Sequence, residues 1–354
     1  MPKALISQPD LFIASAGILR HKDLSEVMST NWHSLTKRPR NEPIVHDVMG
    51  YKVRITNTHG DGIATIWDHD ITIFLISQLV SAINRGETIS NQIQFTGYEL
   101  FRFLDPMGAG TPGKRDYQLL WAALQRLHHT NIKTTFVPTD AGIRQVESSF
   151  YWLPHIKQVS RTDGTNVGFV VSIDPFMYEW VKNTKNVLTL DLGYFSIKSA
   201  LARYIYLWAR KSVGSRIDRE WSESVKSLHS KSASRDSLKK FLFNLKRLIA
   251  TVKLPGYELR IELTTKGKGG TFEPTLFAKR RRVSIEDIEQ TASDLIQSTP
   301  IAPIEHTLIE EAVLAKGSIK STSAEQAVFV EDHIERALAE ELDTNEGNDT
   351  PWNR

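Results

Sequence analysis

Two segments of the chain share nearly the same one-sided pattern of apolar side chains. In residues 114–130 the apolar positions are Tyr117, Leu120, Trp121, Leu124, Leu127 and His128. In residues 234–251 they are Leu238, Phe241, Leu242, Leu245, Leu248 and Ile249. Both sets advance by the same steps, which place all members on one face of an α-helix. The sequence therefore predicts two long helices that each bury one face.

Each long helix occupies the same place in a repeated order of elements. A mostly apolar helix is predicted over 69–85, and another over 196–212. A short helix follows each of them, at 97–104 and at 221–229, and strands follow each long helix. Helix, short helix, longer helix, strand and hairpin wing is the order of a winged helix-turn-helix. We therefore predict an α+β fold with tandem winged helix-turn-helix domains.

Changes in composition divide the chain into four parts. Residues 1–50 are rich in turn formers, and TKRPRNEP at 36–43 resembles a linker, so we predict an N-terminal arm and linker. Residues 51–186 would form the first winged-helix domain and 187–282 the second, which would bind DNA. Residues 283–354 are polar and acidic with few aromatic side chains, which predicts a mostly disordered tail.

Charge is distributed unevenly between these parts. Residues 283–354 contain 16 acidic and 4 basic side chains, whereas residues 1–282 contain 25 acidic and 40 basic ones. The resulting net charges are −12 and +15, although the whole chain has only +3. A basic body with an acidic tail favours a protein that binds a polyanion such as nucleic acid.

The second long helix is the stronger candidate for DNA contact, because its polar side is densely basic. Arg, Lys and Asn side chains on such a helix can pair with base edges in the major groove. The candidates here are Arg235, Lys239, Lys240, Asn244, Lys246 and Arg247. Lys266 and Lys268 lie on a Gly-rich turn where a wing would meet phosphates. The basic run Lys279, Arg280, Arg281 and Arg282 could follow the DNA backbone.

The first long helix has fewer basic side chains on its polar side. Its candidate contacts are Lys114, Arg115, Gln118, Gln125 and Arg126. A glycine-rich segment leads into this helix, and such a helix N-terminus favours a phosphate group. The first unit would bind bases more weakly than the second, or would serve partly for dimer contact.

Several catalytic and metal-binding classes are disfavoured. The chain has no cysteine, which excludes disulfides, thiolate zinc sites and iron–sulfur ligation. The segment GAGTPGKR at 108–115 fits G-x4-G-K of a phosphate-binding loop, but Arg115 stands where Ser or Thr must ligate magnesium. A P-loop NTPase is therefore the weaker alternative, and we expect no catalytic residues, no metal and no cofactor.

A short peptide near the N-terminus suggests a protein partner. Gln8-Pro-Asp-Leu-Phe12 resembles the peptide by which bacterial replication proteins bind the polymerase sliding clamp. Leu11 and Phe12 would be apolar anchors, Gln8 would fix the register, and Asp10 would complete the motif. The alternative is that Leu11 and Phe12 pack back on the first winged helix as an N-terminal strand.

Four stretches of the body resemble the plasmid replication initiator protein A family of alphaproteobacterial plasmids. They are HGDGIATIWDHDI at 59–71, FTGYELFRFL at 95–104, KRDYQLLWAALQRLHHTNIKT at 114–134, and residues 227–262 with SLHSKSASRDSLKKFLFNLKRL and LPGYELRIE. The resemblance covers roughly residues 5–280. It implies a protein that binds repeated sites in double-stranded DNA at a plasmid origin and recruits host replication factors.

The resemblance and the residues leave some alternatives open. A winged-helix transcriptional repressor, acting on its own gene, would share these features. The active form could be a monomer or a homodimer. No apolar run is long enough to span a bilayer and no secretory signal is apparent, so we expect a cytoplasmic protein without membrane contact.

Overall fold

The computed structural model describes residues 11–14, 19–48, 51–105, 111–135, 147–160, 162, 166–214, 219–265 and 272–281. The chain divides into two compact units, Met1–Arg281 and Arg282–Arg354, and all described residues belong to the first. The acidic tail predicted over 283–354 therefore lies outside the described residues.

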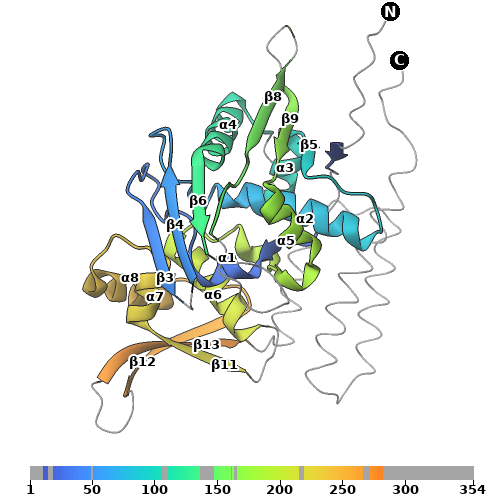
Figure 1. Cartoon of the computed structure of the whole chain (residues 1–354). Helices are drawn as coiled ribbons and strands as arrows, with labels where there is room; N and C mark the ends of the chain where they lie inside the picture. The colour runs from blue at the N-terminus through green and yellow to red at the C-terminus, as the bar shows by residue number, and fades with distance from the viewer. Residues whose placement is uncertain are drawn as a thin grey trace, which may run out of the picture. The chain divides into compact units, whose positions relative to one another are not determined.

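Two sets of elements in the first unit follow one order (Figure 1). The first set comprises α2 (His69–Asn84), β5 (Gln92–Phe95), α3 (Gly97–Leu104), α4 (Lys114–His129), β8 (His155–Ser160) and β9 (Asn166–Ser172). The second set comprises α6 (Ala200–Val213), β11 (Glu220–Ser224), α7 (Val225–Ser232), α8 (Leu238–Thr251), β12 (Tyr257–Thr265) and β13 (Phe272–Arg280). In both, the last strand pairs antiparallel with a strand on each side, in the orders β5-β9-β8 and β11-β13-β12.

Another antiparallel sheet lies beside the first set. Its order is β3-β4-β6-β7, with β3 (Ile44–Val48), β4 (Tyr51–Asn57), β6 (Thr130–Thr134) and β7 (Ser148–Tyr151). Strands β6 and β7 come between α4 and β8 in the chain, so the first set carries an insertion that the second lacks. The remaining described elements are β1 (Leu11–Ile13), β2 (Lys22–Leu24), α1 (Ser25–Ser29), α5 (Pro175–Lys182), the 3-10 turns η1 (Thr184–Asn186) and η2 (Leu192–Tyr194), and β10 (Val187–Thr189).

Two short helices illustrate where local signals succeed and fail. Helix α3 spans the predicted residues 97–104, because Thr96 Oγ1 accepts from the Glu99 amide at 3.2 Å and the Glu99 carboxylate accepts from the Thr96 amide. The short helix predicted over 221–229 is wrong at its start. Residues 220–224 form β11, which pairs with β13, and α7 begins only at Val225.

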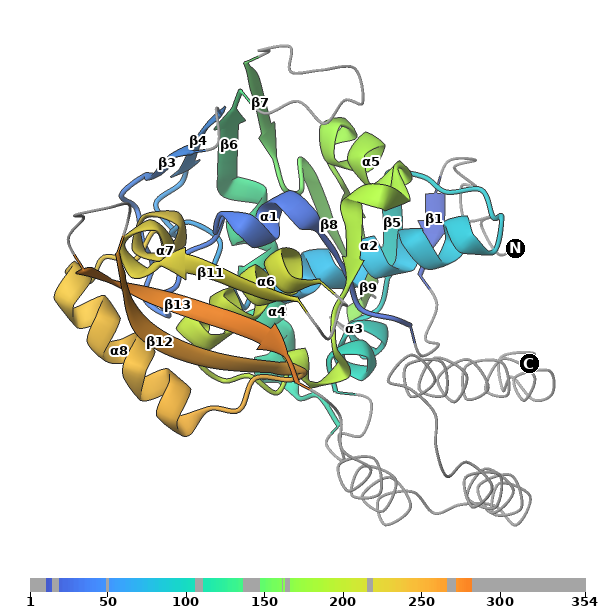
Figure 2. The same ribbon diagram turned by 90° about the horizontal axis from the view of Figure 1, so that it is seen from below.

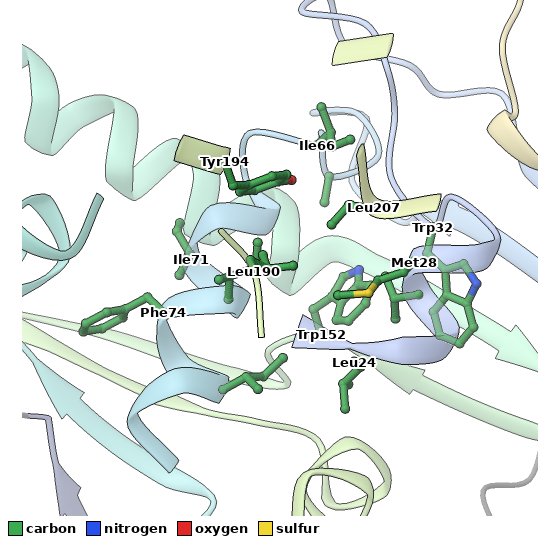
Figure 3. Close-up of a cluster of buried hydrophobic side chains, with 14 of the residues drawn as sticks. Leu24, Met28, Trp32, Ile66, Ile71, Phe74, Trp152, Leu190, Tyr194 and Leu207 are labelled. Atoms are coloured by element: carbon green, nitrogen blue, oxygen red, sulfur yellow. The ribbon is translucent and has the colours of Figure 1, made fainter. Parts of the chain in front are cut away.

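Within the arm and linker predicted over 1–50, the described residues from Leu24 to Trp32 belong to the core. Leu24, Met28 and Trp32 are fully buried or nearly so (Figure 3). The Trp32 ring lies 6.1 Å from that of Trp152 and 6.3 Å from that of Trp180, between ring centroids. Both partners are far from Trp32 in the sequence. The turn-forming residues around Trp32 therefore gave no sign that this segment packs between distant elements.

The two sets of elements are joined through their first helices. Arg203 of α6 donates to the carboxylate of Asp70 on α2 at 2.7 and 2.8 Å, and both side chains are buried. The same guanidinium also donates to the backbone carbonyls of Ile197 and Phe195. Because this charge pair is buried and each of its guanidinium nitrogens is hydrogen-bonded, it links α2 to α6.

Candidate nucleic-acid interface

Helix α8 presents a basic face to solvent while its opposite face is buried. Ser237 caps the helix by accepting from the Lys240 amide at 3.3 Å. Phe241, Leu245 and Leu248 are buried against the sheet and α7, as the apolar pattern predicts. Leu238 is the exception: it belongs to the predicted buried stripe, but it lies in the first turn of the helix and is 41% exposed.

Three of the predicted contacts on and before α8 are exposed cations, and the others are held by carboxylates. Lys239, Lys246 and Arg247 are exposed. Asp236 accepts from Lys240 Nζ at 2.7 Å and from Asn244 Nδ2 at 2.9 Å. Arg235 pairs with Glu42 at 3.0 Å, although both side chains are more than half exposed. The exposed cations therefore lie in the first turn of the helix (Lys239) and in its second half (Lys246 and Arg247).

Phe243 lies among these cations, and the sequence analysis did not select it. Its side chain is 64% exposed, two residues beyond the buried Phe241. The sequence could have identified Phe243 as exposed, because its position lies outside the apolar stripe of the helix. An apolar side chain on a major-groove helix can contact the methyl group of thymine.

Helix α4 is less basic, and one of its predicted contacts is held by a carboxylate of the fold. Lys114, Arg115 and Gln118 are exposed in its first two turns, while Gln125 is half-buried. Arg126 instead donates from Nε and Nη2 to the two oxygens of Asp68, each at 2.7 Å. The Asp68 hydrogen bonds raise the pKa of Arg126. These two hydrogen bonds hold the guanidinium against the fold, although its side chain is still 25% exposed, so Arg126 is a weaker candidate for DNA contact than Lys114 and Arg115.

The predicted basic run from Lys279 to Arg282 begins at the end of β13 and is only partly described. Lys279 pairs with Glu258 on β12 at 3.0 Å, and Arg281 donates to the Tyr257 carbonyl at 3.4 Å. Arg280 is half-buried. Lys266, Lys268 and Arg282 lie outside the described residues. Of the predicted wing, the structure therefore describes the two strands β12 and β13 and not the turn between them.

For Phe12 the structure favours the strand alternative over clamp binding. Leu11 and Phe12 belong to β1, which pairs in parallel with β5, and Phe12 is only 9% exposed. A clamp peptide must offer both apolar side chains to its partner, whereas here the strand alternative holds. Gln8 and Asp10 lie outside the described residues.

The context of GAGTPGKR also argues against a nucleotide-binding loop. The element before it is helix α3, whereas a phosphate-binding loop follows a buried strand. In the part of the chain that the structure describes, no group of three or more His, Asp or Glu side chains could hold a metal ion. No helix among the described residues is long and apolar enough to cross a membrane.

Comparison with known proteins then decides the family. Residues 22–259 match the family described as replication initiator protein A. The chain belongs to this family. A putative replication protein of Wigglesworthia glossinidia brevipalpis is 36% identical to this chain over 206 residues. The matched residues cover 57% of this chain and 72% of that protein.

The fold also resembles that of solved structures. A crystal structure of domains 2 and 3 of RctB superposes on the initiator with a TM-score of 0.50 and 11% identity, covering 73% of the initiator and 99% of that chain. A second structure of RctB domains 2–3 has a TM-score of 0.46. At this identity the likeness concerns the fold alone, and it agrees with the mixed α and β architecture. Family membership supports a role as a replication initiator.

Proposed function

We propose that this initiator binds repeated sequences in double-stranded DNA at a plasmid origin through two winged helix-turn-helix units. Helix α8 would enter the major groove as the main recognition helix, and α4 would contribute a second, weaker contact. The proposal extends to recruitment of host replication factors, which rests on the family resemblance. It assigns the protein a binding role and no catalytic step.

The basic face of α8 is the observation that carries this proposal. Lys239, Lys246 and Arg247 are exposed on a helix whose other side is anchored by Phe241 and Leu245. In helix-turn-helix proteins the second helix of the pair lies in the major groove. Helix α7 is the short first helix of such a pair, and α8 is the second. Strands β12 and β13 form a hairpin beside α8 (Figure 2).

The test begins with footprinting on the DNA that flanks the gene of this protein. We expect protected direct repeats. The double substitution Lys239→Ala/Lys246→Ala should then weaken binding to the protected duplex, and should reduce the slope of log affinity against log salt by about one for each lost phosphate contact. Neither side chain supports the core, so the unfolding temperature should stay unchanged.

A matched control removes two exposed lysines elsewhere on the surface. Lys185→Ala/Lys198→Ala changes the net charge equally, but both positions lie outside α4 and α8. We expect it to affect binding much less. Equal losses in the two variants would show that only net charge matters, and would contradict the assignment of α8.

A further inference from the structure

The loop between α1 and β3 contacts the segment before α2 and also the second set of elements. In the segment before α2, the Ile63 amide donates to the Arg40 carbonyl at 2.8 Å. Gly62 has a φ of +94°, and a Cβ at this position would come within 2.8 Å of Pro39 Cα. The turn at residues 59–62 thus packs directly on the loop, and only glycine fits at this approach.

On the side of the second set, the same loop binds the turn between α7 and α8. Arg40 Nη1 donates to the Ala233 carbonyl at 2.6 Å, and Ala233 is the left-handed residue of that turn. Two residues further along, Arg235 pairs with Glu42 of the loop. Asn31 donates to the carbonyls of Lys231 and Ser232, both at 2.9 Å. The segment therefore holds the start of α8 in place.

Internal hydrogen bonds fix the conformation of the loop itself. Arg40 donates from Nε to the Glu42 carbonyl at 3.1 Å and from Nη2 to the Pro43 carbonyl at 3.3 Å. Thr36 Oγ1 donates to the Arg38 carbonyl at 2.9 Å. A ligand that binds such a loop need not order it first, which lowers the entropic cost of binding.

Residues 36–43 also concentrate positive charge on the surface. Lys37 and Arg38 are exposed, with Lys37 Nζ 5.4 Å from the centroid of the Trp67 ring. Burial and the neighbouring charge of Arg235 lower the pKa of Arg40. Glu42 is the acidic side chain of the loop, and it is already paired with Arg235.

We propose that residues 36–43 form a third DNA contact, in which Lys37 and Arg38 bind backbone phosphates between the DNA segments reached by α4 and α8. This inference rests on the proposed function. In helix-turn-helix proteins the first helix of the pair crosses the backbone and the second enters the groove. A loop bonded to the turn between α7 and α8 therefore lies beside a phosphate-bearing strand.

The experiment compares Lys37→Ala/Arg38→Ala with the wild-type full chain, on the duplex that the wild-type protein protects. We expect weaker binding and a salt slope smaller by about two. Hydroxyl-radical footprinting should show protection lost between the two major-groove contacts, with the groove contacts themselves retained. The unfolding temperature should not change. If the unfolding temperature of this variant falls, the same measurements are made on Lys37→Gln/Arg38→Gln. Glutamine keeps a long side chain that forms hydrogen bonds but removes the charge.

Parallel variants separate this inference from the proposed function. Lys239→Ala/Lys246→Ala tests α8, and Lys185→Ala/Lys198→Ala controls for net charge. If the α8 variant binds weakly while the loop variant keeps wild-type affinity, salt slope and footprint, the loop inference is wrong and the proposed function stands. If the wild-type protein protects no flanking DNA, the proposed function itself fails.

Discussion

Arg126 and Phe12 mark the limit of what residue patterns alone can show about the site. Periodicity places Arg126 on the polar side of α4, but its carboxylate partner, Asp68, comes from a segment before α2. Phe12 fits a short peptide motif, yet its burial depends on β5. The exposed cations of α8 were predictable because helical spacing decides their exposure, whereas pairing across the fold has no local signal.

The buried pair of Asp70 and Arg203 should be the most sensitive point of the fold. We predict that Arg203→Ala destabilises the protein by about 3–5 kcal/mol, because it leaves a buried carboxylate without its partner. Equilibrium denaturant unfolding measures this loss. Replacing both residues, as Asp70→Leu/Arg203→Met, should restore much of the stability. A double variant as unstable as Arg203→Ala would contradict this account.

Three buried histidines predict that acid destabilises the fold. Burial lowers the pKa of His21 to about 4, and it also lowers the pKa values of His33 and His46. Below a pH of about 6.5, the unfolded chain takes up protons that the folded chain does not, so stability present above that pH is lost as the pH falls toward 4. His21 alone accounts for at most about 3 kcal/mol.

The measurement is the unfolding temperature at about pH 7.5 and pH 5. We expect a marked fall for the wild type and a smaller fall for His21→Asn, which cannot titrate. The quantity to compare is the fall in unfolding temperature between the two pH values, and not the unfolding temperature itself. His21→Asn also removes the ring contacts with Phe103 and Phe195, which lowers stability at both pH values. An equal fall in both proteins would show that His21 does not contribute.

At the scale of elements, the sequence predicts best where a structure is determined by near neighbours. Helix α3 has the predicted ends because its cap lies within four residues. Strand β8 has no signal in the sequence, because it is an edge strand with mostly exposed side chains and no alternating pattern marks it. Strand β11 was taken for helix because Glu220 and Ser222 are polar and their partners on β13 are more than fifty residues away.

The cap of α3 allows a direct test of this local control. We predict that Thr96→Ala costs about 1 kcal/mol of folding stability, because it removes the oxygen that accepts from the Glu99 amide. Thr96→Ser keeps that oxygen and should cost much less. Thermal or denaturant unfolding of the two variants distinguishes the outcomes. Equal losses would indicate that the threonine methyl group matters and the cap does not.

At the scale of the whole molecule, the repeated order of elements was predictable, but the way the two sets are joined was not. The apolar stripes of α4 and α8 indicate two similar units. Their connection depends on Arg203 reaching Asp70, and on Trp32 packing against Trp152 and Trp180. Each of these contacts links residues separated by more than one hundred positions, and no spacing rule identifies such pairs.

Under the proposed function, the Asp70–Arg203 contact between α2 and α6 limits which DNA the protein can recognise. Two DNA-binding units on a flexible tether would tolerate any distance between their target sequences, whereas two units fixed to one core must meet both targets on the same side of the duplex. Inserting about five base pairs between the two contacted segments rotates one target by half a helical turn and should abolish joint binding. Inserting about ten base pairs returns both targets to the same side of the duplex but leaves them about one helical turn farther apart. This insertion should therefore recover little of the joint binding. Gel-shift affinities on this series of duplexes measure the rotational phase that the core imposes.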